Sequence, residues 1–214
     1  MIFRKHLELN GRHAKLSPSS WRWLNDDDES FVKRICSLYL ADIGTILHDI
    51  ARKHIKHRIK LNKYDKKNVM LELVERGIPA YVVDMINLDA IFENLMRYVN
   101  DCVAYKMTPE VILYFSNNCY GTADAINYNE ETHILRIYDL KTGTTPAHME
   151  QLIIYVALFC LEYGIKPNSI HVELRIYQGG EEPWIDEPTV EQITTAIETI
   201  ITRDNFMNKM REED

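Results

Sequence analysis

The sequence has few cysteines and no long apolar run, and each absence excludes certain classes of protein. The four cysteines, at positions 36, 102, 119 and 160, form no CxxC pair, which excludes zinc-finger spacing and predicts reduced, mostly buried thiols. The longest apolar run, residues 152–161, is about half of what a membrane span needs. The N-terminus continues into polar sequence rather than into an apolar signal core. We therefore expect a cytoplasmic protein with no membrane partner.

Repeats, glycine- or serine-rich linkers and low-complexity segments are also lacking. A chain of 214 residues with 46% hydrophobic and 27% charged residues is ordinary for a globular protein and short for two domains. We expect one domain over residues 1–214.

The net charge is −7, but the charges are unevenly distributed. Residues 52–67 contain eight basic side chains and one acid, Asp65, whereas acids gather at residues 26–29. A nucleic-acid partner depends on such a local basic patch rather than on the net charge. The alternative interpretation of the basic segment is a solvated helix face.

The hydrophobic periodicity changes near Pro109, which divides the chain into two parts. Residues 1–106 are predicted to be mainly helical, and residues 107–214 to form an α/β core. Helices are expected from the Ser17-Pro18 cap, from near Glu29, and over residues 66–76, 79–105, 147–163 and 189–210. Strands are expected over residues 111–115, 123–128, 134–140 and 170–177, with the second and third forming an antiparallel hairpin.

Three residues of this hairpin could carry chemistry. Asp139 and Lys141 are two residues apart in one strand, so they project to the same side, and Asp124 can meet them from the neighbouring strand. Two converging carboxylates form an oxygen site suited to Mg²⁺ or Mn²⁺, and a lysine beside them can orient or deprotonate a bound water. A salt-bridged surface hairpin is the alternative interpretation.

Two helical features agree with such a site. Gln151 and Tyr155 share one face of the helix that follows the strand. Upstream, the small residues Ala41 and Gly44 precede His48 in a row that permits close packing, so the imidazole could be a further metal ligand. A polar pair at a helix edge and a packed histidine are the alternatives.

Five motifs in this order resemble the RecB-like branch of the PD-(D/E)XK nucleases, in particular the phage-type exonucleases. The resemblance covers residues 16–155 and rests on Leu16-Ser-Pro-Ser-Ser-Trp-Arg-Trp-Leu24, Gly44-Thr-Ile-Leu-His48, Gly121-Thr-Ala-Asp124, Asp139-Leu-Lys141 and Gln151-x-x-x-Tyr155. It implies a restriction-endonuclease-like core, a mixed sheet flanked by helices, with a helical N-terminal region. In two respects the chain departs from the family pattern: the second carboxylate is Asp139 rather than glutamate, and Ala123 replaces the motif's proline.

The resemblance also implies roles for individual residues. His48, Asp124, Asp139 and the Leu140 carbonyl would bind Mg²⁺ or Mn²⁺. Lys141 would serve the attacking water, with Gln151 and Tyr155 in support, and Glu110 is a further acidic candidate. No cysteine after Cys160 completes a cluster, so no iron–sulfur centre is expected. The proposed DNA-binding residues are Arg52, Lys53, Lys56, Arg58 and Lys60.

The function expected from the resemblance is an exonuclease that hydrolyses phosphodiester bonds from DNA ends in recombination or DNA processing. A single-strand annealing protein is a candidate partner, a homo-oligomer stays open, and a phage-encoded protein would act in the host cytoplasm. A structure- or site-specific endonuclease on the same core is one alternative. A catalytically inactive nucleic-acid-binding module is the other.

Overall fold

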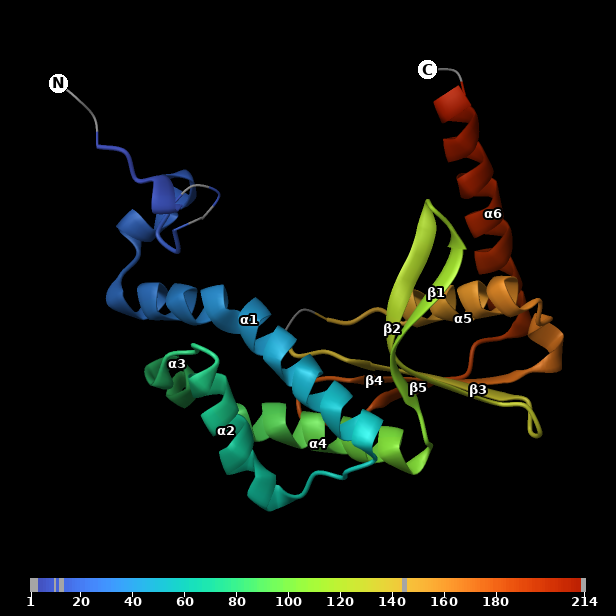
Figure 1. Cartoon of the computed structure of the whole chain (residues 1–214), viewed down its shortest axis with the longest axis horizontal. Helices are drawn as coiled ribbons and strands as arrows, with labels where there is room; N and C mark the ends of the chain where they lie inside the picture. Colours follow the sequence, from blue (N-terminus) through green and yellow to red (C-terminus); the bar gives the residue numbers. More distant parts are fainter. Residues whose placement is uncertain (1–3, 10, 12–13, 144–145, 213–214) are drawn as a thin grey trace.

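A computed structural model describes residues 4–9, 11, 14–143 and 146–212 (Figure 1). The described residues form a five-stranded sheet flanked by helices, with a helical N-terminal region, so the predicted α/β class is confirmed. The 3₁₀ helices are η1 (Leu7–Leu9), η2 (Pro18–Asn25), η3 (Lys63–Asp65) and η4 (Pro167–Ser169). The α-helices are α1 (Asp28–His57), α2 (Lys66–Glu75), α3 (Ala80–Met85), α4 (Leu88–Ala104), α5 (Glu150–Tyr163) and α6 (Val190–Glu212). The strands are β1 (Thr108–Ser116), β2 (Cys119–Asn129), β3 (Ile134–Leu140), β4 (His171–Tyr177) and β5 (Trp184–Asp186).

The sheet is mixed and follows the chain order β1-β2-β3-β4-β5. The β1–β2, β2–β3 and β4–β5 pairs are antiparallel, which confirms the predicted hairpin of the second and third strands. The β3–β4 pair is parallel, and α5 makes the connection between these two strands.

Two hydrophobic cores cover the two faces of this sheet. On one face, helices α1 to α4 pack around residues such as Leu47, Val82 and Leu95, and the sheet contributes Tyr138 and Leu140. On the other face, α5 and the start of α6 pack on the sheet through a second group of buried residues. That group includes Leu113, Leu135, Ile137, Val156 and Ile193. The apolar side chains of β3 alternate between the cores, as the two-residue period of a strand requires.

The predicted helices are found with two corrections. Residues 79–105 were expected as one helix, but α3 ends at Met85, and α4 begins at Leu88 after a short break. The Asn87 side chain accepts a hydrogen bond from the Ala90 amide at 3.2 Å and so caps α4. The segment after Ser17-Pro18 is a 3₁₀ helix rather than an α-helix. β5, which is three residues long, was not expected.

None of the described helices is both long enough and apolar enough to cross a membrane. All four cysteines are free thiols, and those at 102 and 160 are buried.

Candidate functional site

The candidate site lies where the sheet divides. β2 pairs with β3 from Asn129 as far as Ala125 and continues with β1 alone, so the β1–β2 hairpin leaves the sheet at this point (Figure 1). β3 instead continues beside β4 to Leu140. Asp124 is the first residue of β2 beyond the last β2–β3 pair, and its Oδ2 accepts a hydrogen bond from the Leu140 amide at 3.0 Å. At this fork the Asp124 carboxylate, rather than a main-chain carbonyl of β2, therefore accepts the hydrogen bond of the Leu140 amide.

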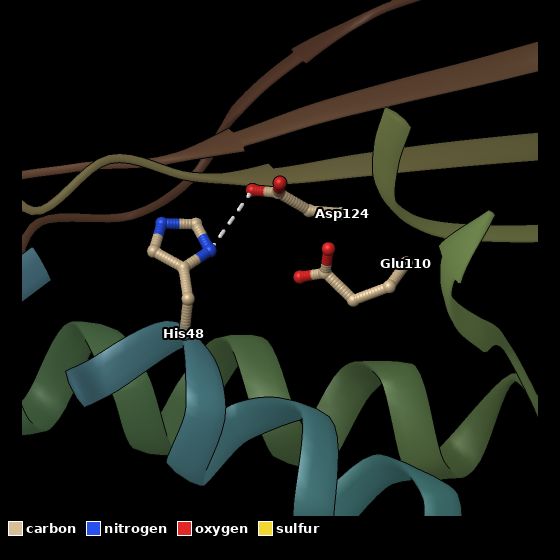
Figure 2. Close-up of side chains that lie close together, drawn as sticks. All are labelled: His48, Glu110 and Asp124. Carbon is tan, nitrogen blue, oxygen red and sulfur yellow. Dashed lines mark ion pairs between the residues drawn. The ribbon is translucent and has the colours of Figure 1, made fainter. Parts of the chain in front are cut away.

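Three side chains from separate elements meet at the fork. His48 of α1, Glu110 of β1 and Asp124 of β2 each direct one potential ligand atom to a space in which these atoms lie within 4.8 Å of one another (Figure 2). His48 Nδ1 lies 3.6 Å from Asp124 Oδ2. Glu110 has a φ of +55°, a backbone conformation that is uncommon for a residue with a side chain and is found at functional sites.

A second group lies at the end of β3. The Asp139 side chain is buried, and Lys141 Nζ donates a hydrogen bond to its Oδ1 at 3.2 Å and lies 3.0 Å from its Oδ2. Oδ2 is itself buried, and the Lys141 ammonium is its charge partner. Lys141 Nζ also donates to Gln151 Oε1 at 2.9 Å, and the Tyr155 hydroxyl donates to the Thr122 carbonyl at 2.7 Å. The two α5 residues thus hold the lysine and the departing strand.

The electrostatics of the fork disfavour a second negative charge. Burial is the largest cause that raises the pKa of Asp124, and the charge of Asp139 is the next. His48 and the Leu140 amide act in the opposite direction, and the Asp124 pKa is about 6 instead of 3.8. Without a cation, the site therefore holds a carboxylate in an environment that opposes its ionisation.

Two glycines of the sequence motifs permit close approach at the site. A Cβ on Gly44 of α1 would lie 2.7 Å from Thr142 Oγ1, next to the end of β3. A Cβ on Gly121 of β2 would lie 3.0 Å from the Tyr155 ring. The first glycine lets α1 approach the end of β3, and the second lets the hairpin pack on α5.

An open hollow of about 490 Å³ lies over the His48 cluster. Its lining residues come from α1, from β1 and β2, and from the residue that follows Lys141. They are Leu40, Ala41, Gly44, Thr45, His48, Asp49, Arg52, Glu110, Asp124 and Thr142. The row of small residues that precedes His48 in the sequence therefore forms one wall of the hollow.

A family model described as "Protein of unknown function (DUF2800)" matches residues 13–199. The chain belongs to this family. The matched range contains all five strands and every residue of the fork. No curated protein and no solved structure matches the chain.

The proposed DNA-binding residues have different surroundings. Arg52 lines the hollow and pairs with Asp49 at 3.2 Å, while Lys53 pairs with Glu72 at 3.1 Å. Lys56 and Lys60 are exposed near the end of α1. Arg58 is engaged in the fold: it ends α1 at a φ of +59°, and its guanidinium donates to the Met107 carbonyl at 2.6 Å and the Lys106 carbonyl at 3.3 Å.

The structure brings together the other predicted site residues. His48, Glu110 and Asp124 form one group, and Asp139, Lys141 and Gln151 form the adjoining one. Leu140 takes part through its amide, and a ligand role for its carbonyl stays a prediction.

Asn94 of α4 was missed. Its side-chain amide donates to the carbonyls of Lys141, at 3.3 Å, and Tyr177, at 3.0 Å, so it fixes the ends of β3 and β4. A polar residue within the otherwise apolar buried stripe of α4 was the available signal.

Proposed function

We propose that this chain is a Mg²⁺- or Mn²⁺-dependent DNA nuclease of the RecB-like PD-(D/E)XK type. The proposal is supported chiefly by one observation: Asp124, Asp139 and Lys141 converge at a fork of the sheet, beside His48 and Glu110. The sheet topology is compatible with that fold and is not specific to it. The phage-type exonuclease assignment rests on the order of the sequence motifs.

The residues present suit a hard divalent cation. Glu110 and Asp124 would supply oxygen donors from the cluster with His48, and the buried Asp139 carboxylate, paired with the Lys141 ammonium at 3.0 Å, would add another. Carboxylates and one imidazole together are compatible with Mn²⁺ and Mg²⁺. A bound ion would supply a more acidic water and would stabilise negative charge on a phosphodiester.

The chain's own groups would position and activate the nucleophile. The Lys141 ammonium is held between Asp139 and Gln151, so its position is fixed before substrate arrives. As the ammonium it can orient a water, and as the neutral amine, which desolvation by the DNA favours, it can take the water's proton. Arg52, on the wall of the hollow, would contact a phosphate, and basic residues continue after it to the C-terminal end of α1.

The decisive assay compares end-labelled linear duplex, covalently closed circle, nicked circle and single strand, each with Mg²⁺, Mn²⁺ or EDTA. An exonuclease releases nucleotides from the linear substrates and leaves a covalently closed circle intact. An endonuclease cuts the closed circle, and an inactive binding module retains DNA without cutting it. Asp139→Asn and Lys141→Ala should each abolish cleavage.

Matched controls are available outside the site. Asp84 of α3 and Lys166 after α5 are both exposed, so Asp84→Asn and Lys166→Ala test the general effect of removing one such charge. Cleavage by these two variants should equal that of the parent. The proposal is wrong if purified protein cuts no substrate with either metal, or if Lys141→Ala protein cuts as fast as the parent.

A further inference from the structure

An exposed strip of apolar side chains lies on the β1–β2 hairpin beyond the fork. We call Ile112, Tyr114 and Tyr120 the tyrosine strip. Their exposed fractions are 61%, 45% and 63%, which is high for large apolar side chains. The two tyrosine rings stack with centroids 6.2 Å apart and an interplanar angle of 29°. The opposite face of the hairpin is buried against α5, so this strip is the free face of a supported hairpin.

The register of the hairpin leads from the fork to the strip. Ile112 pairs with Thr122, and Tyr114 pairs with Tyr120. Ile112 and Thr122 are two residues from Glu110 and Asp124, so each step along the strip spans about 7 Å. The strip therefore starts beside the carboxylates. Tyr114 and Tyr120 lie four residues from Glu110 and Asp124, about 13 Å along the strands from the carboxylate positions.

We propose that the tyrosine strip binds the bases of single-stranded nucleic acid adjacent to the phosphate held at the fork. This inference rests on the proposed nuclease function and names its substrate more narrowly. Exposed aromatic rings stack on nucleobases without regard to sequence. A duplex hides the faces of its bases within its own stack, so the strip selects an unpaired strand or a frayed end.

Two contacts favour a nucleic acid over a protein that would extend the sheet. β1 is an edge strand, yet the Tyr114 amide already donates to Glu162 Oε2 at 2.8 Å, which blocks strand addition there. The Tyr114 hydroxyl donates to Asn117 Oδ1 at 3.1 Å, which restrains the ring in its exposed position. A restrained ring loses less side-chain entropy when a base stacks on it.

The test measures binding rather than cleavage. Fluorescence anisotropy of a labelled oligothymidylate, and of a labelled blunt duplex, is recorded with Ca²⁺ in place of Mg²⁺, and gels verify that each oligonucleotide stays intact. Tyr114→Ala and Tyr120→Ala should each weaken single-strand binding by about tenfold or more. Tyr114→Phe and Tyr120→Phe keep the ring and should bind within about twofold of the parent. Tyr81→Ala, at a half-exposed tyrosine of α3, is the matched control and should change nothing.

Salt dependence separates the strip from the basic segment. Stacking releases no phosphate counterions, so the alanine variants should keep the parent's slope of log affinity against log salt. The inference is overturned if the parent does not bind the single strand, if alanine variants bind as tightly as the parent, or if phenylalanine variants lose as much as alanine variants. Loss of self-association without loss of DNA binding in the alanine variants would also overturn it.

Failure of this inference is distinguishable from failure of the proposed function. If alanine variants bind normally while Asp139→Asn abolishes cleavage, the strip is excluded and the nuclease stands. If alanine variants lose binding while the parent cuts nothing with either metal, the strip stands as a binding surface without the nuclease.

Discussion

Replacing Asp124 with asparagine should make the metal-free protein more stable. The side chain is 19% exposed, and burial and the Asp139 charge together raise the Asp124 pKa from 3.8 to about 6. A tenfold change in proton affinity is worth about 1.4 kcal/mol, so the ionised Asp124 lowers the free energy of unfolding by about 3 kcal/mol. Asparagine keeps an oxygen that can accept the Leu140 amide hydrogen bond and carries no charge.

The pH dependence has a defined sign. Because the folded-state pKa is raised, the folded protein holds the Asp124 proton more tightly than the unfolded chain. Well below pH 3.8 the carboxyl is protonated in both states and has no effect on stability. Between about pH 4 and pH 6 its contribution to stability falls, and above pH 6 the full loss is present. The variant should therefore gain stability over the parent as the pH rises through this window.

Urea unfolding in EDTA at pH 4, 6 and 8 measures this difference. We expect Asp124→Asn to exceed the parent by up to about 3 kcal/mol at pH 8, and by less than about 1 kcal/mol at pH 4. Asp84→Asn, at an exposed position, should follow the parent at every pH. Mn²⁺ at 100 times its dissociation constant should stabilise the parent by about 2.7 kcal/mol and the Asp124→Asn protein by much less. This electrostatic account would be refuted if the variant were less stable than the parent at pH 8, or if the difference in free energy of unfolding were the same at every pH.

Three further predictions follow from the same structure. Gly180→Ala should lower the free energy of unfolding by at least about 2 kcal/mol in urea melts, because the Gly180 φ is +79° and a Cβ there would lie 2.9 Å from the α4 backbone. Gly179→Ala, which has open space at its Cβ, should lower the free energy of unfolding by less. Reversing the charges of Lys56 and Lys60 should weaken DNA binding in anisotropy titrations and flatten its salt dependence, and an unchanged slope would remove these residues from the DNA path. Asn94→Leu should lower stability by about 1–3 kcal/mol in urea melts, since it removes the hydrogen bonds to the Lys141 and Tyr177 carbonyls, and parental stability would contradict these contacts.

The elements with a strong period were predictable from the sequence. The stripe of apolar residues along α1, the run that forms α5 and the alternation in β3 each require burial on particular faces. The break between α3 and α4 was not predictable in this way, because apolar residues continue across it, and the Asn87 cap decides the boundary. β5 contains three residues, which are too few to show the two-residue alternation of a strand in the sequence.

The site was predictable where its residues are close in sequence. Asp139 and Lys141 share a side because strands alternate, and one hairpin brings Asp124 near them. Contacts between distant segments could not be read in this way. Asn94 reaches carbonyls 47 and 83 residues away, and the Arg58 guanidinium turns back to the loop before β1, which no local pattern specifies.

The arrangement of charges at the fork argues against a salt-bridged hairpin. A structural salt bridge would place the lysine between the two aspartates, where it could offset both charges. Lys141 instead contacts Asp139 and Gln151, and the basic partner of Asp124 is an imidazole at 3.6 Å. Glu110 makes no ion pair among the described residues, although its carboxylate shares a space with Asp124 and His48. Burial and the Asp139 charge disfavour the ionised Asp124, a bound cation would offset both effects, and this is the physical reason to propose a metal at the fork.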